Sequence, residues 1–259
     1  MTYRFFNSWV MDTVEIGIII GVGIIAGFIN TLAGSGSLLT LPVLIFFGLD
    51  PNVANGTNRI AILFQSLVGS RTFLKHKIFS LKEGLQISIP VVLGSVAGAF
   101  IADSLDKNTM KTAIAILLVL MTIFTIFKPE KFIGKTETQK KKFGILQIII
   151  FFAIGIYGGF IQAGVGFFLL AGLVLGSGYD LSKANAIKNL VVFIYTPFAL
   201  TVYIINGQVD YLYGFILTIG SVIGAYTASM MAIKKGVQLI RYILIFALTA
   251  SAMKLFGLF

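Results

Sequence analysis

The sequence predicts an all-α integral membrane protein made of two inverted repeats of about five segments each, with a broken helix in each repeat. First, 57% of the 259 residues are hydrophobic and 12% are charged, whereas a soluble domain carries about 25% charged residues. Second, two glycine-rich stretches, 27–36 and 159–166, interrupt apolar runs at matching places in the two halves. Inside a membrane, such interruptions persist only where protein or a water-lined cavity satisfies the freed backbone groups.

Apolar runs define the expected helices. They cover 14–30, 38–48, 53–74, 81–101, 108–127, 143–161, 167–177, 183–205, 209–231 and 237–256. Eight of them approach or reach the roughly 17–25 residues that span a bilayer. The two short runs directly follow the glycine-rich stretches, and a helix of that length extends only about 16 Å. We therefore predict that each is a re-entrant half-helix, which follows a helix that enters the membrane and breaks.

The two halves align in three ordered blocks. At a spacing of 132, the identical positions are Gly23, Gly27, Phe28 and Ile29 in the first half and Gly155, Gly159, Phe160 and Ile161 in the second. At a spacing of 130, they are Gly34, Gly36, Gly48, Asp50, Ala54 and Asn55 and their counterparts Gly164, Gly166, Gly178, Asp180, Ala184 and Asn185. At a spacing of 126, the segments 94–96 and 98–99 match 220–222 and 224–225. The predicted organisation is a first repeat over 1–127, a linker over 128–142 and a second repeat over 143–259. An odd number of segments leaves the chain on the opposite side of the membrane, so the repeats are predicted to be inverted.

Orientation follows from the positions of the basic residues. Fifteen of the 20 Lys and Arg residues fall on the side of the 128–142 linker, and five fall on the other side. The positive-inside rule then places this linker in the cytoplasm and both termini outside. The formal net charge of +10 is explained by topology, and we expect no nucleic-acid partner.

Both glycine-rich breaks are candidate anion sites. The first N–H groups of a helix lack internal partners, and the helix dipole places about half a positive charge there. Ser35, Gly36 and Ser37 open the first short helix, and the 162–167 segment repeats this arrangement in the second half. Two half-helix N-termini aimed at one centre would form an anion pocket.

A second interpretation is that the glycines allow helices to pack closely. The pairs Gly17 and Gly21, Gly23 and Gly27, and Gly155 and Gly159 have the required four-residue spacing. Around the breaks, both interpretations stay open. For the pairs 94/98 and 220/224, which lie inside uninterrupted helices, close packing is favoured.

The candidate substrate-binding residues are the polar and small residues at the breaks and in the first turns of the helices that follow. They are Asn30, Thr31, Gly34, Ser35, Gly36, Ser37, Asn55, Asn58, Arg59, Gln162, Gly164, Val165, Gly166, Asn185, Lys188 and Asn189. Polar groups within a membrane are costly and usually mark a function. The alternative is that the asparagines cap helices and the two cations extend to the interface.

The composition argues against an enzyme. The chain has no cysteine, its one histidine (His76) lies in a lysine-rich loop, and all ten acidic residues lie at or near segment ends. No catalytic set, metal site or cofactor site is therefore predicted, and no mid-membrane carboxylate is available for a proton relay. We expect a small anionic substrate and the lipid bilayer as partners, and the coupling proton or ion and the oligomeric state stay open.

The run from Gly27 to Leu44, followed by Gly48 and the 54–58 segment (ANGTN), resembles the signature of the sulfite exporter TauE/SafE family. A weaker copy runs from Gly159 to Gly166. The resemblance covers essentially the whole chain and implies a multi-pass transporter of sulfite, sulfonates such as sulfoacetate, and related organosulfur anions in the bacterial cytoplasmic membrane. Members often carry a glycine triplet after the first break, which Ser35 and Ser37 interrupt here, so the particular anion stays open.

The hypothesis from the sequence is a secondary transporter that carries a small sulfur-containing anion by alternating access. One alternative is an anion channel through the same central pocket. Another is a transporter of a non-sulfur anion such as a small carboxylate. A structural membrane protein without a substrate is disfavoured, because helix packing does not require interrupted helices.

Overall fold

The structure is a computed structural model that describes residues 11–127 and 143–255, with side chains up to 234 except at 118 and 121–127. Every regular element in these ranges is a helix, as predicted. The helices are α1 (Thr13–Leu32), α2 (Ser37–Phe46), α3 (Pro51–Lys75), α4 (Leu81–Asp103), α5 (Lys107–Phe127), α7 (Ile145–Phe160), α8 (Val165–Ala171) continued by the π-helix Gly172–Gly176, α9 (Leu181–Ile205) and α10 (Tyr211–Leu255). The predicted linker 128–142 lies outside the described residues.

Local sequence signals explain where several helices begin. The Asp180 carboxylate accepts a hydrogen bond from the Lys183 amide at 2.9 Å at the start of α9. Ser80 and Glu83 form a reciprocal capping box at the start of α4, and Pro51 occupies the first turn of α3. The acidic and serine side chains are favoured there because they accept hydrogen bonds from free helix N–H groups, and proline is favoured because it has no N–H group to satisfy.

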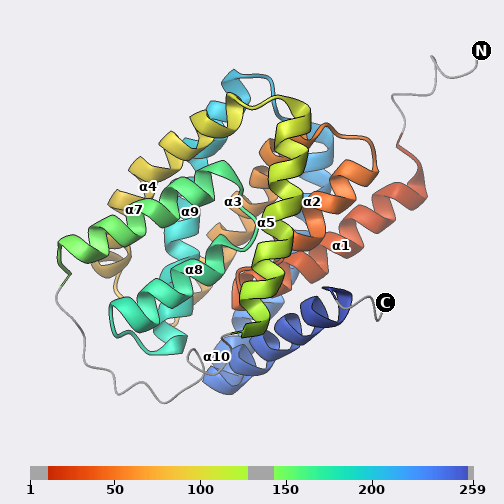
Figure 1. The fold of residues 1–259 in the computed structure, drawn as a ribbon. Coiled ribbons are helices and arrows are strands. Elements are labelled where there is room, and N and C mark those ends of the chain that lie inside the picture. The colour runs from red at the N-terminus through yellow and green to blue at the C-terminus, as the bar shows by residue number, and fades with distance from the viewer. Residues whose placement is uncertain (1–10, 128–142, 256–259) are drawn as a thin grey trace, which may run out of the picture.

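Two elements differ from the sequence prediction. The expected helices 209–231 and 237–256 are one element of 45 residues, α10, because the Lys234-Lys235-Gly236 connection contains no proline to end the helical hydrogen bonding. A straight helix of that length would extend about 68 Å, and Figure 1 shows α10 turning back on itself. The second short helix ends in a π-helical turn, in which the Ser177 amide donates to the Gly172 carbonyl at 3.0 Å.

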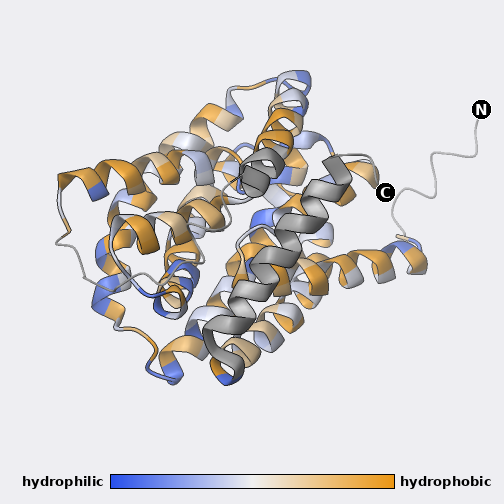
Figure 2. Cartoon of the chain, turned by 60° about the horizontal axis from the view of Figure 1, so that its bottom comes forward, coloured by the Kyte–Doolittle hydropathy of each residue, from blue (hydrophilic) through white to orange (hydrophobic). Residues whose placement is uncertain are grey.

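The distribution of apolar residues is that of a membrane protein. Within the described residues, four helices are long and apolar enough to cross a bilayer: Thr13–Leu32, Leu81–Asp103, Leu181–Ile205 and Tyr211–Lys234. Many large apolar side chains are exposed, among them Phe46 at 83% and Ile205 at 77%, and Figure 2 shows apolar residues along most of the helices. Buried residues include many polar ones instead, with most of those in α3 and α9. Soluble monomers rarely expose such extensive apolar surface.

Helices from the two halves pack across one another. The inner helices α3 and α9 contact each other, α10 packs on α3, and α4 packs on α9. On the outside, α1 lies against α10 and α7 lies against α4 (Figure 1). Each of these outer pairs joins one helix of the first half to one helix of the second half. The same set of contacts is obtained when the two halves are exchanged.

Glycines at the outer interfaces allow backbone-to-backbone contact. A Cβ atom on Gly98 of α4 would lie 1.9 Å from the Ile156 carbonyl oxygen of α7. A Cβ atom on Gly224 of α10 would lie 2.1 Å from the Ile24 carbonyl oxygen of α1. The packing interpretation of these pairs is thereby confirmed. By contrast, a Cβ atom added to Gly17 or Gly21 would have no heavy atom within 4 Å. The prediction of close packing at that pair is therefore wrong.

We expect Gly98→Ala to lower the melting temperature of the purified protein strongly, because the new methyl group overlaps the α7 backbone. The matched control is Gly21→Ala, which adds a methyl group to open space in α1. Alanine is favoured over glycine within a helix by about 1 kcal/mol, so this control is expected to melt at the same temperature or higher. Equal melting temperatures for the two variants would contradict the close α4–α7 contact.

Candidate functional site

Both predicted helix breaks are present. The first separates Leu32, the last residue of α1, from Ser37 at the start of α2, and the second separates Phe160 from Val165. Gly34 and Gly164 have φ angles of +81° and +77°, in the left-handed region that residues with a side chain rarely adopt. Glycine is therefore required by the backbone conformation at one position in each break.

The two breaks meet inside the protein. A Cβ atom on Gly34 would lie 2.3 Å from Gly166 Cα, and one on Gly166 would lie 2.4 Å from Gly34 Cα. No side chain fits between these two backbones. The first break is therefore in direct contact with the first turn of α8.

Helix N–H groups remain open at this meeting point. In the first break, the Gly36 amide donates to Asn30 Oδ1 at 2.7 Å, and the Leu38 amide donates to the Ser35 carbonyl at 3.1 Å. The N–H groups of Ser37 and Gly166 find no acceptor among the described residues. Unpaired amides at the start of a helix are the groups that bind anions.

Buried cations occupy the other side of each break, near the carbonyl ends of α1 and α7. Lys188 Nζ donates to the Asn30 and Thr31 carbonyls at the end of α1, at 2.8 and 2.9 Å. Arg59 donates from Nη1 to the Gly158 carbonyl at 3.0 Å and from Nη2 to the Gly159 carbonyl at 2.7 Å, near the end of α7. A cation at a helix C-terminus is favoured by the helix dipole.

Neither cation reaches the surface. Arg59 and Lys188 are 0% and 1% exposed, so the alternative in which they extend to the membrane interface is wrong. The ion pairs among the described residues join Lys107 to Asp50 and Lys183 to Glu83. Within the described part of the chain, the two buried cations therefore have no carboxylate partner.

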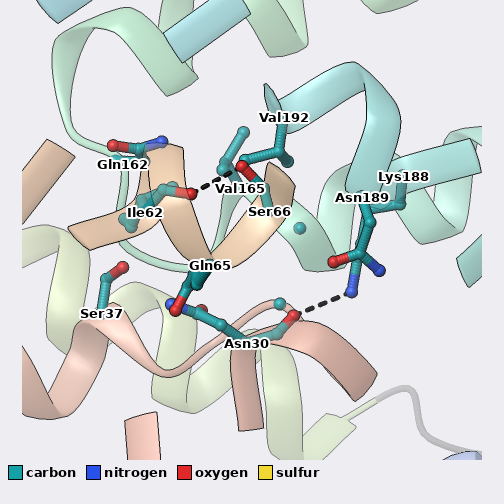
Figure 3. A pocket seen from close by; sticks show the side chains of 12 residues that line it. Asn30, Ser37, Ile62, Gln65, Ser66, Gln162, Val165, Lys188, Asn189 and Val192 are labelled. Atoms are coloured by element: carbon teal, nitrogen blue, oxygen red, sulfur yellow. Dashed lines mark hydrogen bonds between the residues drawn. The ribbon is translucent and has the colours of Figure 1, made fainter. Parts of the chain in front are cut away.

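A cavity lies beside the point where the breaks meet. It encloses about 300 Å³ of space not filled by protein, including its open side. Its lining residues come from α1, the two breaks, α2, α3, α8 and α9, and most of their side chains converge on one space (Figure 3). They are Asn30, Gly34, Ser37, Ile62, Gln65, Ser66, Gln162, Val165, Gly166, Lys188, Asn189 and Val192.

Half of the sixteen candidate residues line this cavity. Those that do are Asn30, Gly34, Ser37, Gln162, Val165, Gly166, Lys188 and Asn189, and those that do not are Thr31, Ser35, Gly36, Asn55, Asn58, Arg59, Gly164 and Asn185. The second group is packed around the breaks instead. Asn55 Nδ2, for example, donates to the Phe160 carbonyl and to the Tyr203 hydroxyl, both at 2.8 Å, and Asn58 Oδ1 accepts from Thr40 Oγ1 at 2.7 Å.

Four lining residues are absent from the sequence prediction: Ile62, Gln65, Ser66 and Val192. Ile62, Gln65 and Ser66 lie four, seven and eight positions after Asn58 along α3, which places them on one face of the helix. That periodicity was the available signal. The predicted site residues of α3 lie only in its first turns, so they do not include this face.

The cavity has the chemistry of an anion site. Its lining combines the Lys188 ammonium with the amide or hydroxyl groups of Asn30, Ser37, Gln65 and Gln162. No aspartate or glutamate belongs to the lining. These groups provide hydrogen-bond donors and one positive charge.

Comparison with known proteins identifies relatives over nearly the full chain. The family model described as sulfite exporter TauE/SafE matches residues 19–255. The probable membrane transporter protein YfcA of Escherichia coli is 28% identical over 253 residues, which cover 96% of this chain and 93% of the relative. A probable membrane transporter protein of Haemophilus influenzae is 29% identical, with 87% of this chain and 88% of the relative covered. No solved structure matches this chain.

We expect Gly34→Ala to destabilise the protein and to separate the two breaks, because the methyl group overlaps the Gly166 backbone. The matched control is Gly48→Ala, which has a similar φ of +97° but no heavy atom within 4 Å of the added Cβ. Left-handed strain costs about 1–2 kcal/mol in both variants, so the control isolates the overlap. A melting temperature for Gly34→Ala no lower than for Gly48→Ala would contradict the contact.

Proposed function

Because the chain belongs to the sulfite exporter TauE/SafE family of membrane transporters, we propose that it carries small sulfur-containing anions across the cytoplasmic membrane by alternating access. The observation that carries this proposal is the buried Lys188 ammonium, which lines a cavity without any carboxylate. The substrate is sulfite or a sulfonate-like organosulfur compound.

The cavity attracts an anion because its positive charge is not neutralised by the protein. A buried charge without a partner is costly in a low-dielectric interior. Lys188 uses two of its three N–H donors on the Asn30 and Thr31 carbonyls, which leaves one donor for a ligand. A bound oxyanion therefore supplies the missing counter-charge and an acceptor together.

The charge of the cavity lining also favours a singly charged substrate. With Lys188 as the one cation of the lining, a monoanion neutralises the site and a dianion leaves an excess negative charge in the membrane. Hydrogen sulfite and small monosulfonates are monoanions and meet this condition, whereas sulfate does not.

The candidate residues divide into two roles. Those that line the cavity contact the anion, with the Ser37 and Gly166 amides as donors beside Lys188. The remaining candidates hold the breaks in place: Arg59 and Asn55 bind the carbonyls at the end of α7, and Gly164 supplies the turn before α8. Asn185 fits neither role: it is 0% exposed, and its side-chain amide has no hydrogen-bond partner among the described residues.

Alternating access follows from the architecture that we propose, in which two inverted repeats each contain a re-entrant helix. The exchange of contacts between the halves and the shortness of α2 and α8 support this arrangement. Rocking of one repeat against the other would expose the cavity to each side in turn. The central linker faces the cytoplasm and both termini lie outside, as the basic residues indicate.

We expect Lys188→Met to weaken anion binding at least tenfold in purified protein, because the charge and the remaining N–H donor are lost. Binding is measured by thermal shift and calorimetry with sulfite, methanesulfonate, sulfate, thiosulfate, sulfoacetate, taurine and acetate. Lys183→Met on the same helix is the matched control, because Lys183 pairs with Glu83 and does not line the cavity. Lys188→Arg, which keeps the charge, shows whether a loss reflects charge or misfolding. Undiminished binding by Lys188→Met would overturn the site, and a preference for acetate would favour a carboxylate substrate.

Electrical recording separates a transporter from an anion channel through the same pocket. We expect reconstituted protein to carry fewer than about 10³ ions per second, the upper range of ordinary turnover. Each cycle of a transporter requires a conformational change, whereas a channel conducts continuously. Single-channel currents well above that rate would identify the channel.

A further inference from the structure

We propose that Gln65 contacts the transported anion and sets the preference of the site for oxyanions over spherical anions. This inference rests on the proposed function, because it concerns the same cavity. It adds a residue that neither the sequence motifs nor the breaks identify, since Gln65 lies in the middle of α3, 14 positions after the start of the helix at Pro51.

Gln65 is buried and still faces open space. The side chain is 4% exposed and belongs to the cavity lining. Figure 3 shows that it points from α3 toward Ser37 and Asn30, at the first break. Its amide therefore lies on the same side of the cavity as the open Ser37 N–H group.

The Gln65 amide has no hydrogen-bond partner among the described residues. The other described glutamines that are shielded from the surface all have one. Gln162 Nε2 donates to the Tyr195 hydroxyl at 3.2 Å, Gln208 Nε2 donates to Asp103 at 2.8 Å, and Gln147 Oε1 accepts from the Gly144 amide at 3.0 Å. The Gln65 amide borders the cavity rather than packed protein, so a ligand in the cavity can supply the missing hydrogen bonds.

The second half of the chain makes the contrast sharper. At the spacing of 130 that relates α3 to α9, the counterpart of Gln65 is Tyr195. The Tyr195 hydroxyl is buried and is hydrogen-bonded to Gln162. The polar group at this level is thus satisfied within the protein in the second half and left open in the first half.

A neutral amide and a lysine select different properties of an anion. The Lys188 ammonium attracts any negative charge. The Gln65 amide offers two N–H donors and one acceptor in fixed directions, so it favours an anion whose oxygen atoms lie at matching positions. An oxyanion can place separate oxygen atoms on the Gln65 amide and on the Lys188 ammonium, whereas a monatomic anion offers one centre for both groups. Sulfite has several oxygen acceptors, and chloride is spherical.

The test compares sulfite with chloride on wild-type protein and four variants, by calorimetry in detergent. Gln65→Leu is expected to weaken sulfite binding at least tenfold and to change chloride binding less than threefold, which lowers the selectivity ratio. Gln65→Asn is expected to keep part of the affinity, and Gln65→Glu to lose it, because a second negative charge enters the site. Gln86→Leu, an exposed glutamine on α4, is the matched control and is expected to bind as the wild type does.

The melting temperature without ligand distinguishes a binding role of Gln65 from a purely structural role. Because Gln65 has no protein partner, Gln65→Leu is expected to melt at or above the wild-type temperature. A lower melting temperature, or an unchanged sulfite-to-chloride ratio, would overturn the assignment of Gln65. Loss of sulfite binding in Lys188→Met with unchanged binding in Gln65→Leu would overturn this inference alone. Absence of sulfite and sulfonate binding in the wild type would overturn the proposed function as well.

Discussion

The structure depends on satisfying backbone groups where α1 and α7 end inside the protein. These helix ends are packed away from the surface, so each carbonyl and N–H group without a helical partner needs one from the protein or from a ligand. The carbonyls near the end of α1 bind Lys188, and those near the end of α7 bind Arg59. The N–H groups of Ser37 and Gly166, on the far side of each break, have no such partner in the described part of the chain. The protein has thus neutralised the negative ends of the broken helices and left the positive ends open.

This division explains why polar and apolar residues are distributed as they are. The inner helices α3 and α9 supply the cations and amides, and they are covered by α10 and α4 and by the outer helices. Glycines at 98 and 224 bring the outer helices to backbone contact. The apolar surface then faces outward, and the polar groups are concentrated around the breaks and the cavity.

The sequence was sufficient for the all-helical class, the position of both breaks and the family. Apolar length and paired glycines are local signals, and they are read directly from the chain. It was insufficient for the division of candidate residues, because facing the cavity depends on helix rotation and tertiary contacts. Arg59 and Lys188 occupy similar stretches of their helices, yet only Lys188 lines the cavity. From sequence, Gln65 is a single polar position that favours hydrogen bonding between helices, and only the structure shows that its side chain makes no such bond among the described residues.

The pairing of α1 with α10 and of α7 with α4 has a consequence for biogenesis. The glycine face of α1 finds its partner about 190 residues later in the chain, so the ribosome must synthesise nearly the whole protein before that interface forms. Until then, the face of α1 that contains Gly23 and Gly27 has no α10 to pack against. Insertion and final assembly are therefore separate events in time, and the emerging chain is most vulnerable to wrong helix partners between them.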